Sequence, residues 1–313
     1  MSRFVIMADA TCDLAEEYLK EYDIILMPGH ISVPDGSDIT LCAEWNRFES
    51  MENFYGELKK NPSGYTTSPA NVEECEEMFE KYAAEGIPVL AIALSSGISG
   101  AYNNKLMAKE NVLKKYPDAV IECVDSLRFG PGFGLLVVYA SKLRNEGMSI
   151  QEVTEYIEQN KNRFHQTGWL DDLSFVAKKG RLTHAKAFFG TLAGVKPIGE
   201  FDYNGLTTVI GKVKGAKAAY PVLLDYMEAE IENPEDQIIF IAQSNRYAQA
   251  LEYKKMIEDR FHPKAVYIND LYPLSGINVG PGLMAAYYVG KPITEGLVDE
   301  RALLDKLING GNE

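Results

Sequence analysis

Two clusters of hydroxyl-bearing residues are the first groups in this sequence that could do chemistry. Ser95 and Ser96 follow an apolar run at residues 89–94 and open the segment SSGISG, while Thr67 and Ser68 lie upstream. Hydroxyls and backbone N–H groups at the start of a helix can bind an anion such as a carboxylate or a phosphate. The same residue types also make tight turns and cap helices. The pattern therefore predicts either one anion site shared by two loops or two well-capped turns.

Three further residues could complete such an anion site. Arg181 follows a glycine, Lys214 ends a predicted strand, and Asn278 lies in a segment rich in Gly and Pro. A cation and several hydroxyls that converge on one carboxylate would hold it with charge-assisted hydrogen bonds. Taken singly, each of these residues is more easily explained by structure; the two cations, for example, can simply be solvated at the surface.

Signatures of catalysis are mostly absent from the sequence. There is no phosphate-binding GxxxxGK[ST] loop and no GxSxG nucleophile motif, and Gly130-Pro131-Gly132 is only a fragment of a dinucleotide fingerprint. Ser96 has no histidine in a neighbouring candidate loop, so we expect it to hydrogen-bond rather than attack a substrate. The histidines and cysteines are dispersed along the chain. We expect no catalytic residue, no cofactor and no metal site.

A second interpretation of the sequence is that the protein is an enzyme. Asp9, Asp13 and Asp125 follow predicted strands and have hydroxyls nearby. Carboxylates at strand ends can hold Mg²⁺ and, through it, a phosphate. The alternative hypothesis is therefore an enzyme of small-molecule metabolism, of the phosphotransfer type.

The charge of the chain limits its partners. A net charge of −14 over 313 residues argues against binding to a nucleic-acid backbone, which requires a basic face. No apolar stretch approaches the roughly 20 residues of a spanning helix, so we expect no stable membrane insertion. The scattered cysteines and the N-terminus without a signal peptide predict a cytoplasmic protein.

Repeated strand–loop–helix units predict an α/β fold. Residues 1–163 are expected to form an N-terminal domain with a parallel sheet flanked by helices, and residues 164–313 a smaller α/β domain. Residues 30–64 have an irregular pattern and are predicted to pack over the sheet edge, with a helix near residues 45–59. The segment DYNG at residues 202–205 predicts a β-hairpin turn in the second domain.

An ordered series of motifs then resembles a known family. The segments are DATCDL, TSP, SSGISG, DS, KGRL, KVKG and GPG, beginning at residues 9, 67, 95, 125, 179, 212 and 280. In this order they are similar to motifs of the DegV family of bacterial fatty-acid-binding proteins, and they cover nearly the whole chain. The resemblance implies a two-domain α/β fold, in which the N-terminal domain buries the tail of one long-chain fatty acid.

The resemblance also implies roles for individual residues. Thr67 and Ser96 would bind the carboxylate, Ser68 and Ser95 would line the site, and Arg181 would lie at its mouth or on a partner surface. Characterised relatives carry the acyl chain to a separate, ATP-using fatty acid kinase subunit and are not enzymes themselves. Candidates for the apolar lining are Phe79, Ile92, Leu94, Ile98, Phe129, Phe133, Leu135 and Leu136.

The sequence departs from the family pattern at several positions, and two of these are candidate site residues. Asn278 stands where the family commonly has a histidine; an amide can donate to a carboxylate but cannot become cationic. Lys214 replaces an arginine and loses the planar, two-pronged geometry of a guanidinium.

Overall fold

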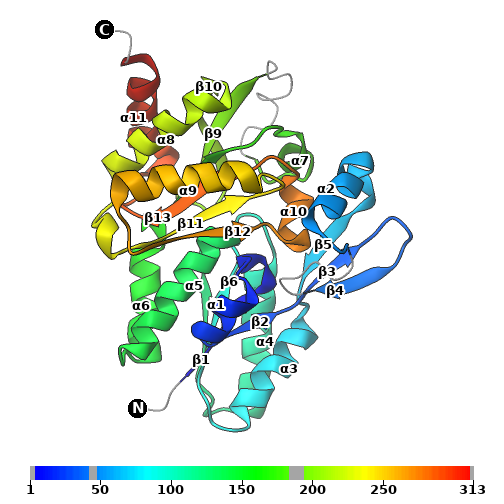
Figure 1. Cartoon of the computed structure of the whole chain (residues 1–313). Coiled ribbons are helices and arrows are strands. Elements are labelled where there is room, and N and C mark those ends of the chain that lie inside the picture. Colours follow the sequence, from blue (N-terminus) through cyan, green and yellow to red (C-terminus); the bar gives the residue numbers. More distant parts are fainter. Residues whose placement is uncertain (1–3, 42–47, 183–193, 311–313) are drawn as a thin grey trace.

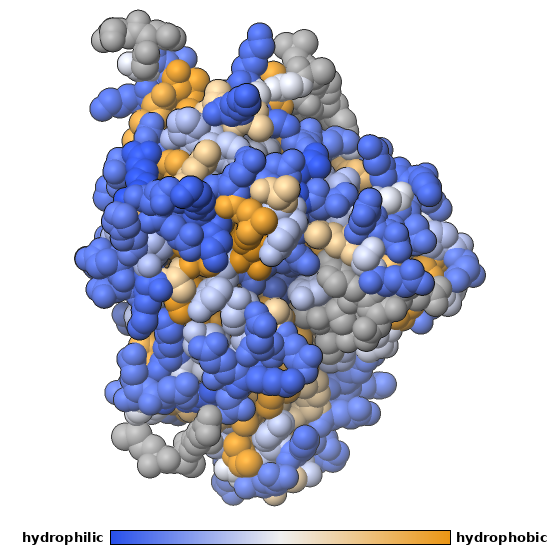
Figure 2. Space-filling view, viewed as in Figure 1, coloured by the Kyte–Doolittle hydropathy of each residue, from blue (hydrophilic) through white to orange (hydrophobic). Residues whose placement is uncertain are grey.

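The computed structural model describes residues 4–41, 48–182 and 194–310. Two sheets dominate it, each with its own set of helices (Figure 1). Helices α8 (Ala216–Glu230), α9 (Tyr247–Phe261) and α11 (Val298–Asn309) gather at one end of the molecule, and α3 (Val72–Ala83) and α4 (Ala101–Lys115) at the other. The face shown in Figure 2 is mainly hydrophilic, with apolar residues in scattered patches.

The first sheet is parallel throughout, as predicted. Its strand order is β2-β1-β6-β7, and its strands are β1 (Val5–Asp9), β2 (Ile24–Met27), β6 (Val89–Ala93) and β7 (Ile121–Asp125). Alternate residues of β1 and β6 face opposite sides, as the pleat requires. Met7 and Ala91 pack against α3 and α4, whereas Ile6 and Ile92 pack against α5 (Gly130–Asn145). Helices therefore cover both faces of this sheet. The remaining helices of this part of the chain are α1 (Glu16–Glu21) and α6 (Ile150–Asn160).

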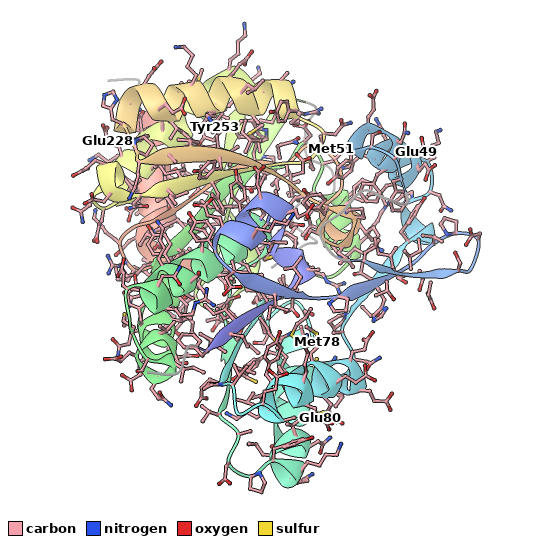
Figure 3. The ribbon with its side chains drawn as sticks, turned by 60° about the horizontal axis from the view of Figure 1, so that its bottom comes forward. Glu49, Met51, Met78, Glu80, Glu228 and Tyr253 are labelled. Carbon is pink, nitrogen blue, oxygen red and sulfur yellow. The ribbon has the colours of Figure 1, made fainter. Side chains whose placement is uncertain are left out.

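The second sheet is mixed and has six strands in the order β10-β9-β8-β13-β11-β12. They are β8 (Phe164–Trp169), β9 (Val195–Phe201), β10 (Thr207–Lys214), β11 (Ile238–Gln243), β12 (Ala265–Asp270) and β13 (Met284–Val289). Strands β9 and β10 are antiparallel and form the predicted hairpin. One face of the sheet packs against α8, α9 and α11 through residues such as Tyr253 (Figure 3) and Leu304.

The opposite face of the second sheet packs against α5. One hydrophobic cluster joins Ile6 and Ile92 of the first sheet, Phe133 of α5, and Phe240 and Tyr287 of the second sheet. Every strand of the first sheet precedes residue 164, and every strand of the second follows residue 163. The division of the chain into two domains at residue 163 stays a prediction, since a shared core joins the two sheets.

A small antiparallel sheet, β4-β3-β5, extends from the edge of the molecule. It consists of β3 (Gly29–Ser32), β4 (Asp38–Leu41) and β5 (Thr66–Pro69). Thr67 and Ser68, which the sequence analysis places in a loop, lie in strand β5, because β3, distant in the sequence, supplies its pairing partner. Helices α2 (Met51–Lys60), α7 (Ser174–Lys178) and α10 (Pro273–Val279) pack beside it.

Helix α2 also connects this small sheet to the second sheet. Met51, at its start, places its sulfur 3.3 Å from both the Gln243 side-chain nitrogen and the Asn245 backbone nitrogen (Figure 3). The predicted helix at residues 45–59 thus corresponds to α2, and residues 42–47 lie outside the described part of the chain. Among the described helices, none combines the length and apolarity needed to cross a bilayer.

A buried ion pair joins the carboxyl ends of β1 and β6 to α4. Asp9 is the last residue of β1, and its Oδ2 accepts a hydrogen bond from the Leu94 backbone N–H at 2.8 Å. The Lys105 ammonium on α4 donates to Asp9 Oδ1, and its side chain is fully buried. The pair fixes the edge of the sheet at which loops carry ligands in α/β folds.

Removal of one partner from this pair should destabilise the protein. Lys105→Met leaves the Asp9 carboxylate buried with one backbone donor, and we expect the free energy of unfolding to fall by about 3–5 kcal/mol. Urea denaturation followed by circular dichroism measures this change. The double variant Asp9→Asn, Lys105→Met, which holds neither charge, should recover part of the loss. A single variant as stable as the parent chain would contradict this account.

Candidate functional site

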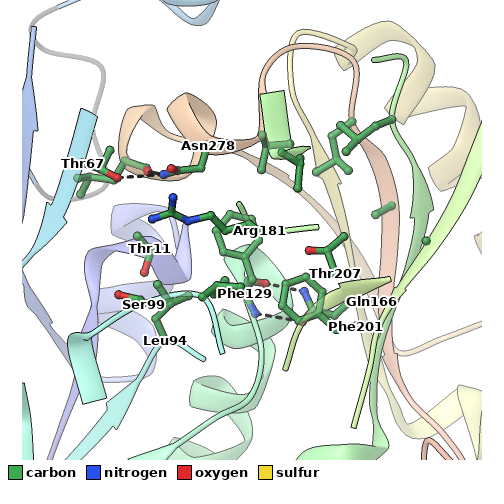
Figure 4. A pocket seen from close by; sticks show the side chains of 18 of the residues that line it. Thr11, Thr67, Leu94, Ser99, Phe129, Gln166, Arg181, Phe201, Thr207 and Asn278 are labelled. Atoms are coloured by element: carbon green, nitrogen blue, oxygen red, sulfur yellow. Dashed lines mark hydrogen bonds between the residues drawn. The ribbon is translucent and has the colours of Figure 1, made fainter. Parts of the chain in front are cut away.

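A cavity of about 200 Å³ lies between the two sheets. On the same scale a single buried water needs only about 10–15 Å³, so a much larger molecule can enter. The loops at the carboxyl ends of β1 and β6 line it together with strands β5, β8, β9, β10 and β13 and helix α10. Figure 4 shows the polar and apolar side chains that surround it. Its apolar lining includes Leu94, Ile98, Phe129, Leu173, Phe201 and Val209.

The lining is drawn from both halves of the chain. Leu94, Ile98 and Phe129 line the cavity, as the sequence predicts. The other five candidates are buried in the hydrophobic clusters and do not reach the cavity; they are Phe79, Ile92, Phe133, Leu135 and Leu136. The resemblance implies a tail buried in the N-terminal domain, yet β8, β9, β10 and β13, which all follow residue 163, form one wall of the cavity.

Thr67 and Asn278 meet on one side of the cavity. The Asn278 amide nitrogen donates to the Thr67 hydroxyl oxygen at 3.0 Å and to the Leu274 carbonyl at 3.1 Å. Both amide hydrogens are thus used within the protein, and the Thr67 hydroxyl, which accepts one bond, retains its own proton for donation. Ser68, the next residue of β5, also lines the cavity and is exposed at its rim.

Arg181 supplies a positive charge to the same region. Of the described residues that line the cavity, it is the only lysine, arginine or histidine. It follows Gly180, whose φ of +72° allows the chain to turn after α7, and its guanidinium donates to the Lys179 carbonyl. In Figure 4 the guanidinium lies between the Thr67–Asn278 pair and Thr11. Arg181 therefore lines the cavity itself, whereas the exposed Lys214 does not.

Hydroxyls that sequence reasoning missed also line the cavity, among them those of Thr11, Ser99 and Thr207. The Thr11 oxygen is buried and has no hydrogen-bond partner within the described part of the chain. The Ser99 oxygen accepts a bond from the Ala101 N–H at 3.2 Å at the start of α4. Thr11 follows β1, and this position after a strand was a signal for a ligand-facing hydroxyl.

Ser95 and Ser96 do not line the cavity, in contrast to the expectation. Ser95 is fully buried, and its hydroxyl donates to the Gly205 carbonyl at 2.7 Å in the β9–β10 turn. Ser96 is exposed, and its backbone N–H donates to Asp125 at 3.1 Å. A Cβ at Gly97 would lie 2.7 Å from the Asn204 carbonyl oxygen. The SSG turn is thus a docking point for the hairpin.

The three aspartates of the enzyme alternative are used within the protein. Asp9 binds Lys105 and the Leu94 N–H, and Asp125 accepts from the Ser96 and Leu127 N–H groups at 3.1 Å each. Asp13 is fully buried and accepts from the Tyr272 N–H at 3.2 Å; burial raises the pKa of its carboxyl well above the ordinary range. Within residues 4–41, 48–182 and 194–310, no three potential ligands are grouped to hold a metal ion. This arrangement lends the phosphotransfer alternative no support.

A second buried ion pair belongs to the cavity wall, because Glu200 is one of the residues that line it. The Glu200 carboxylate accepts hydrogen bonds from the Gln166 and Phe201 N–H groups at 2.6 and 2.9 Å, from the Thr167 hydroxyl at 2.9 Å and from His165 Nδ1 at 3.1 Å. Burial alone would raise the pKa of Glu200 and lower that of His165. Their mutual attraction outweighs burial, so the pKa of Glu200 is lowered and that of His165 is raised.

Comparisons with known proteins agree with this architecture. Residues 3–291 match the family model described as an uncharacterised protein of the DegV family. The chain belongs to the DegV family. A DegV domain-containing protein from Clostridium perfringens is 33% identical over 292 residues, which cover 93% of this chain and 98% of the relative.

Solved DegV structures share the fold. A fatty-acid-binding DegV protein from Thermus thermophilus has a TM-score of 0.82 at 20% identity, covering 92% of this chain and 99% of its own. A stearic-acid-binding protein from Eubacterium ventriosum has a TM-score of 0.76 at 20% identity, covering 92% and 98%. These similarities confirm the predicted DegV-like α/β fold.

The structural role of Ser95 in this DegV protein can be tested directly. Ser95→Ala leaves the buried Gly205 carbonyl without its donor, which should lower the free energy of unfolding by about 1–3 kcal/mol. Urea denaturation measures the loss. Ser96→Ala, at an exposed side chain one residue further, is the matched control and should change nothing measurable. Equal stability of the two variants would contradict the docking role.

The His165–Glu200 pair predicts a defined pH dependence. The pKa of Glu200 lies below its ordinary 4.5, so its contribution to stability is present above pH 4.5 and is lost as the pH falls through the folded-state pKa. The pKa of His165 lies above its ordinary 6.5, so its contribution is complete below pH 6.5 and is lost as the pH rises through the folded-state pKa. The pair thus stabilises the fold most between pH 4.5 and pH 6.5.

An NMR titration of the histidine ring signals tests this assignment. His165 should titrate above pH 6.5 in the unaltered protein. In Glu200→Gln it should titrate below pH 6.5, because burial remains and the carboxylate is gone. An unchanged His165 titration in the variant would refute the pairing.

Proposed function

We propose that this DegV protein binds one long-chain fatty acid in the cavity between its sheets. Its carboxylate lies beside Arg181 and Thr67, and its tail runs along the apolar lining. The observation that carries this proposal is the place of Arg181, which lies next to hydroxyls on one side of a largely apolar cavity and is the one lysine, arginine or histidine among the described lining residues. Membership of the DegV family, and the fatty acids named for the proteins of T. thermophilus and E. ventriosum, support it.

The chemistry of the head group fits these residues. A guanidinium presents N–H donors in a planar fork that matches the two oxygens of a carboxylate. The Thr67 hydroxyl adds a donor, because Asn278 already occupies its acceptor side. Asn278 thus acts on the carboxylate by orienting Thr67. Ser68, Thr11 and Ser99 lie within the same lining and can complete the shell of hydroxyls.

The tail supplies most of the affinity in this proposal. Each buried methylene contributes about 0.8 kcal/mol, so a chain of sixteen to eighteen carbons gains far more from burial than from its head group. The carboxylate contacts then fix the orientation of the chain in the cavity.

We further propose that the protein is a non-catalytic carrier, which presents the carboxylate to a separate kinase subunit that uses ATP. The enzyme reading would need a metal or a nucleophile, and the strand-end aspartates are already engaged by Lys105 and by backbone N–H groups. Ser68 at the rim of the cavity and the exposed Lys214 are the candidates for contact with that subunit. With ATP, acyl phosphate should form only when the kinase subunit from the same organism is added.

Native mass spectrometry of the freshly purified protein tests fatty-acid binding. We expect one added mass of a fatty acid per chain, which organic extraction then identifies. Arg181→Gln should weaken the affinity for palmitate by about 10- to 100-fold, because a charge-assisted hydrogen bond contributes about 1.5–3 kcal/mol. Lys214→Gln removes an equal charge away from the cavity and should leave the affinity unchanged.

Two outcomes would count against this proposal. The first is a clean apo mass with no uptake of added palmitate or oleate. The second is an equal loss of affinity in Arg181→Gln and Lys214→Gln, which would point to overall charge rather than to the cavity. Thr67→Val provides an independent variant, since it keeps the shape of the side chain and removes the donor.

A further inference from the structure

A stacked pair of phenylalanines lines the cavity away from the Thr67–Asn278 pair. Phe129 precedes α5, and Phe201 ends β9; their rings are 6.1 Å apart and tilted by only 3°. Both side chains belong to the cavity lining. In Figure 4 they lie on the opposite side of the cavity from Thr67 and Asn278.

Hydrogen bonds fix the backbone of Phe129 on both sides. Its N–H donates to the Gln166 side-chain oxygen at 3.0 Å, and its carbonyl accepts from the Gln166 amide nitrogen at 2.6 Å. Gln166 is buried, and a Cβ at Gly132 would lie 2.6 Å from its amide group. The ring of Phe129 is therefore attached to a backbone that cannot move without the loss of two buried hydrogen bonds.

Arg128 fixes the backbone of Phe201 in a similar way. Its side chain is completely buried, and its guanidinium donates to the carbonyls of Phe201 and Lys161 at 3.2 and 2.9 Å and to the Asn162 side chain at 2.7 Å. Burial lowers the pKa of Arg128 to about 10, so the group stays charged at neutral pH. A shift of the Phe201 backbone would leave a buried, charged donor unpaired.

We propose that the stacked Phe129–Phe201 pair is the stop that limits the length of the acyl tail. This proposal rests on fatty-acid binding with the carboxylate at Arg181. A tail that starts beside Arg181 and Thr67 grows towards the two rings, which present a flat apolar wall on a fixed backbone. Because packed protein interiors deform little, tail methylenes beyond the two rings have to bend back or stay outside the cavity.

The stop predicts a break in the dependence of affinity on chain length. Each added methylene that is buried should raise the affinity about fourfold, which corresponds to about 0.8 kcal/mol. Beyond the longest tail that fits, affinity should stop rising or fall. Replacement of a ring by a smaller side chain opens space there and should move the break to longer tails.

The experiment measures dissociation constants for saturated fatty acids of about ten to twenty carbons, so that each methylene step is resolved. Phe201→Ala and the milder Phe201→Leu and Phe129→Leu are compared with the delipidated parent protein. We expect the break to shift by about two methylenes in Phe201→Ala, and by less in the leucine variants. Phe133→Leu is the control, because Phe133 is fully buried on α5 and does not line the cavity.

The outcomes separate this proposal from fatty-acid binding itself. If the parent protein binds no fatty acid of any length, the proposed function fails. If it binds them and every variant keeps the parental break, the aromatic stop is wrong. A shift in Phe133→Leu as large as that in Phe129→Leu would also overturn it, because loosened packing would then explain the effect. The leucine variants keep the test decisive if Phe201→Ala does not fold.

Discussion

The close packing of α5 between the two sheets is the constraint on which the rest of the structure depends. The helix begins in the segment GPGFG, and its glycines allow the approach on both sides. A Cβ at Gly134 would lie 2.5 Å from the Cys12 carbonyl oxygen, next to β1, and one at Gly132 would lie 2.6 Å from Gln166 of β8. The helix can therefore share one hydrophobic cluster with both sheets. The cavity lies between the two sheets, beside the loops at the carboxyl ends of β1 and β6.

Two pairs of opposite charges are buried in this DegV protein. Lys105 compensates Asp9 at the edge of the first sheet, and Glu200 is matched by His165 in the second. Arg128 uses backbone carbonyls and an amide oxygen instead of a carboxylate. Such pairs add little net stability, since desolvation offsets much of their attraction. Arg181, in contrast, lines an open cavity, which leaves its charge available to an anion.

The sequence predicted the fold well and the site only in part. The hydrophobic runs and turn residues that define the parallel sheet and the β9–β10 hairpin are local patterns, and both elements were confirmed. Thr67, Ser68 and Asn278 line one cavity together, whereas Ser95 and Ser96 do not line it; the binding of a carboxylate by the first three stays a prediction. A Ser/Gly turn after a strand looks alike whether it faces a ligand or, as at Ser95, the turn of a distant hairpin.

By itself, the sequence determined the family, the α/β pattern and the residue types available for an anion. Periodicity and ordered motifs are properties of neighbouring residues, so the chain carries them without its fold. Only the tertiary structure decided which hydroxyls face the cavity, that Arg181 lines it, and that the second sheet forms one of its walls. Those facts depend on contacts between residues far apart in the chain. The positions of these residues depend on the packing of α5 against both sheets, and no local sequence pattern determines that packing.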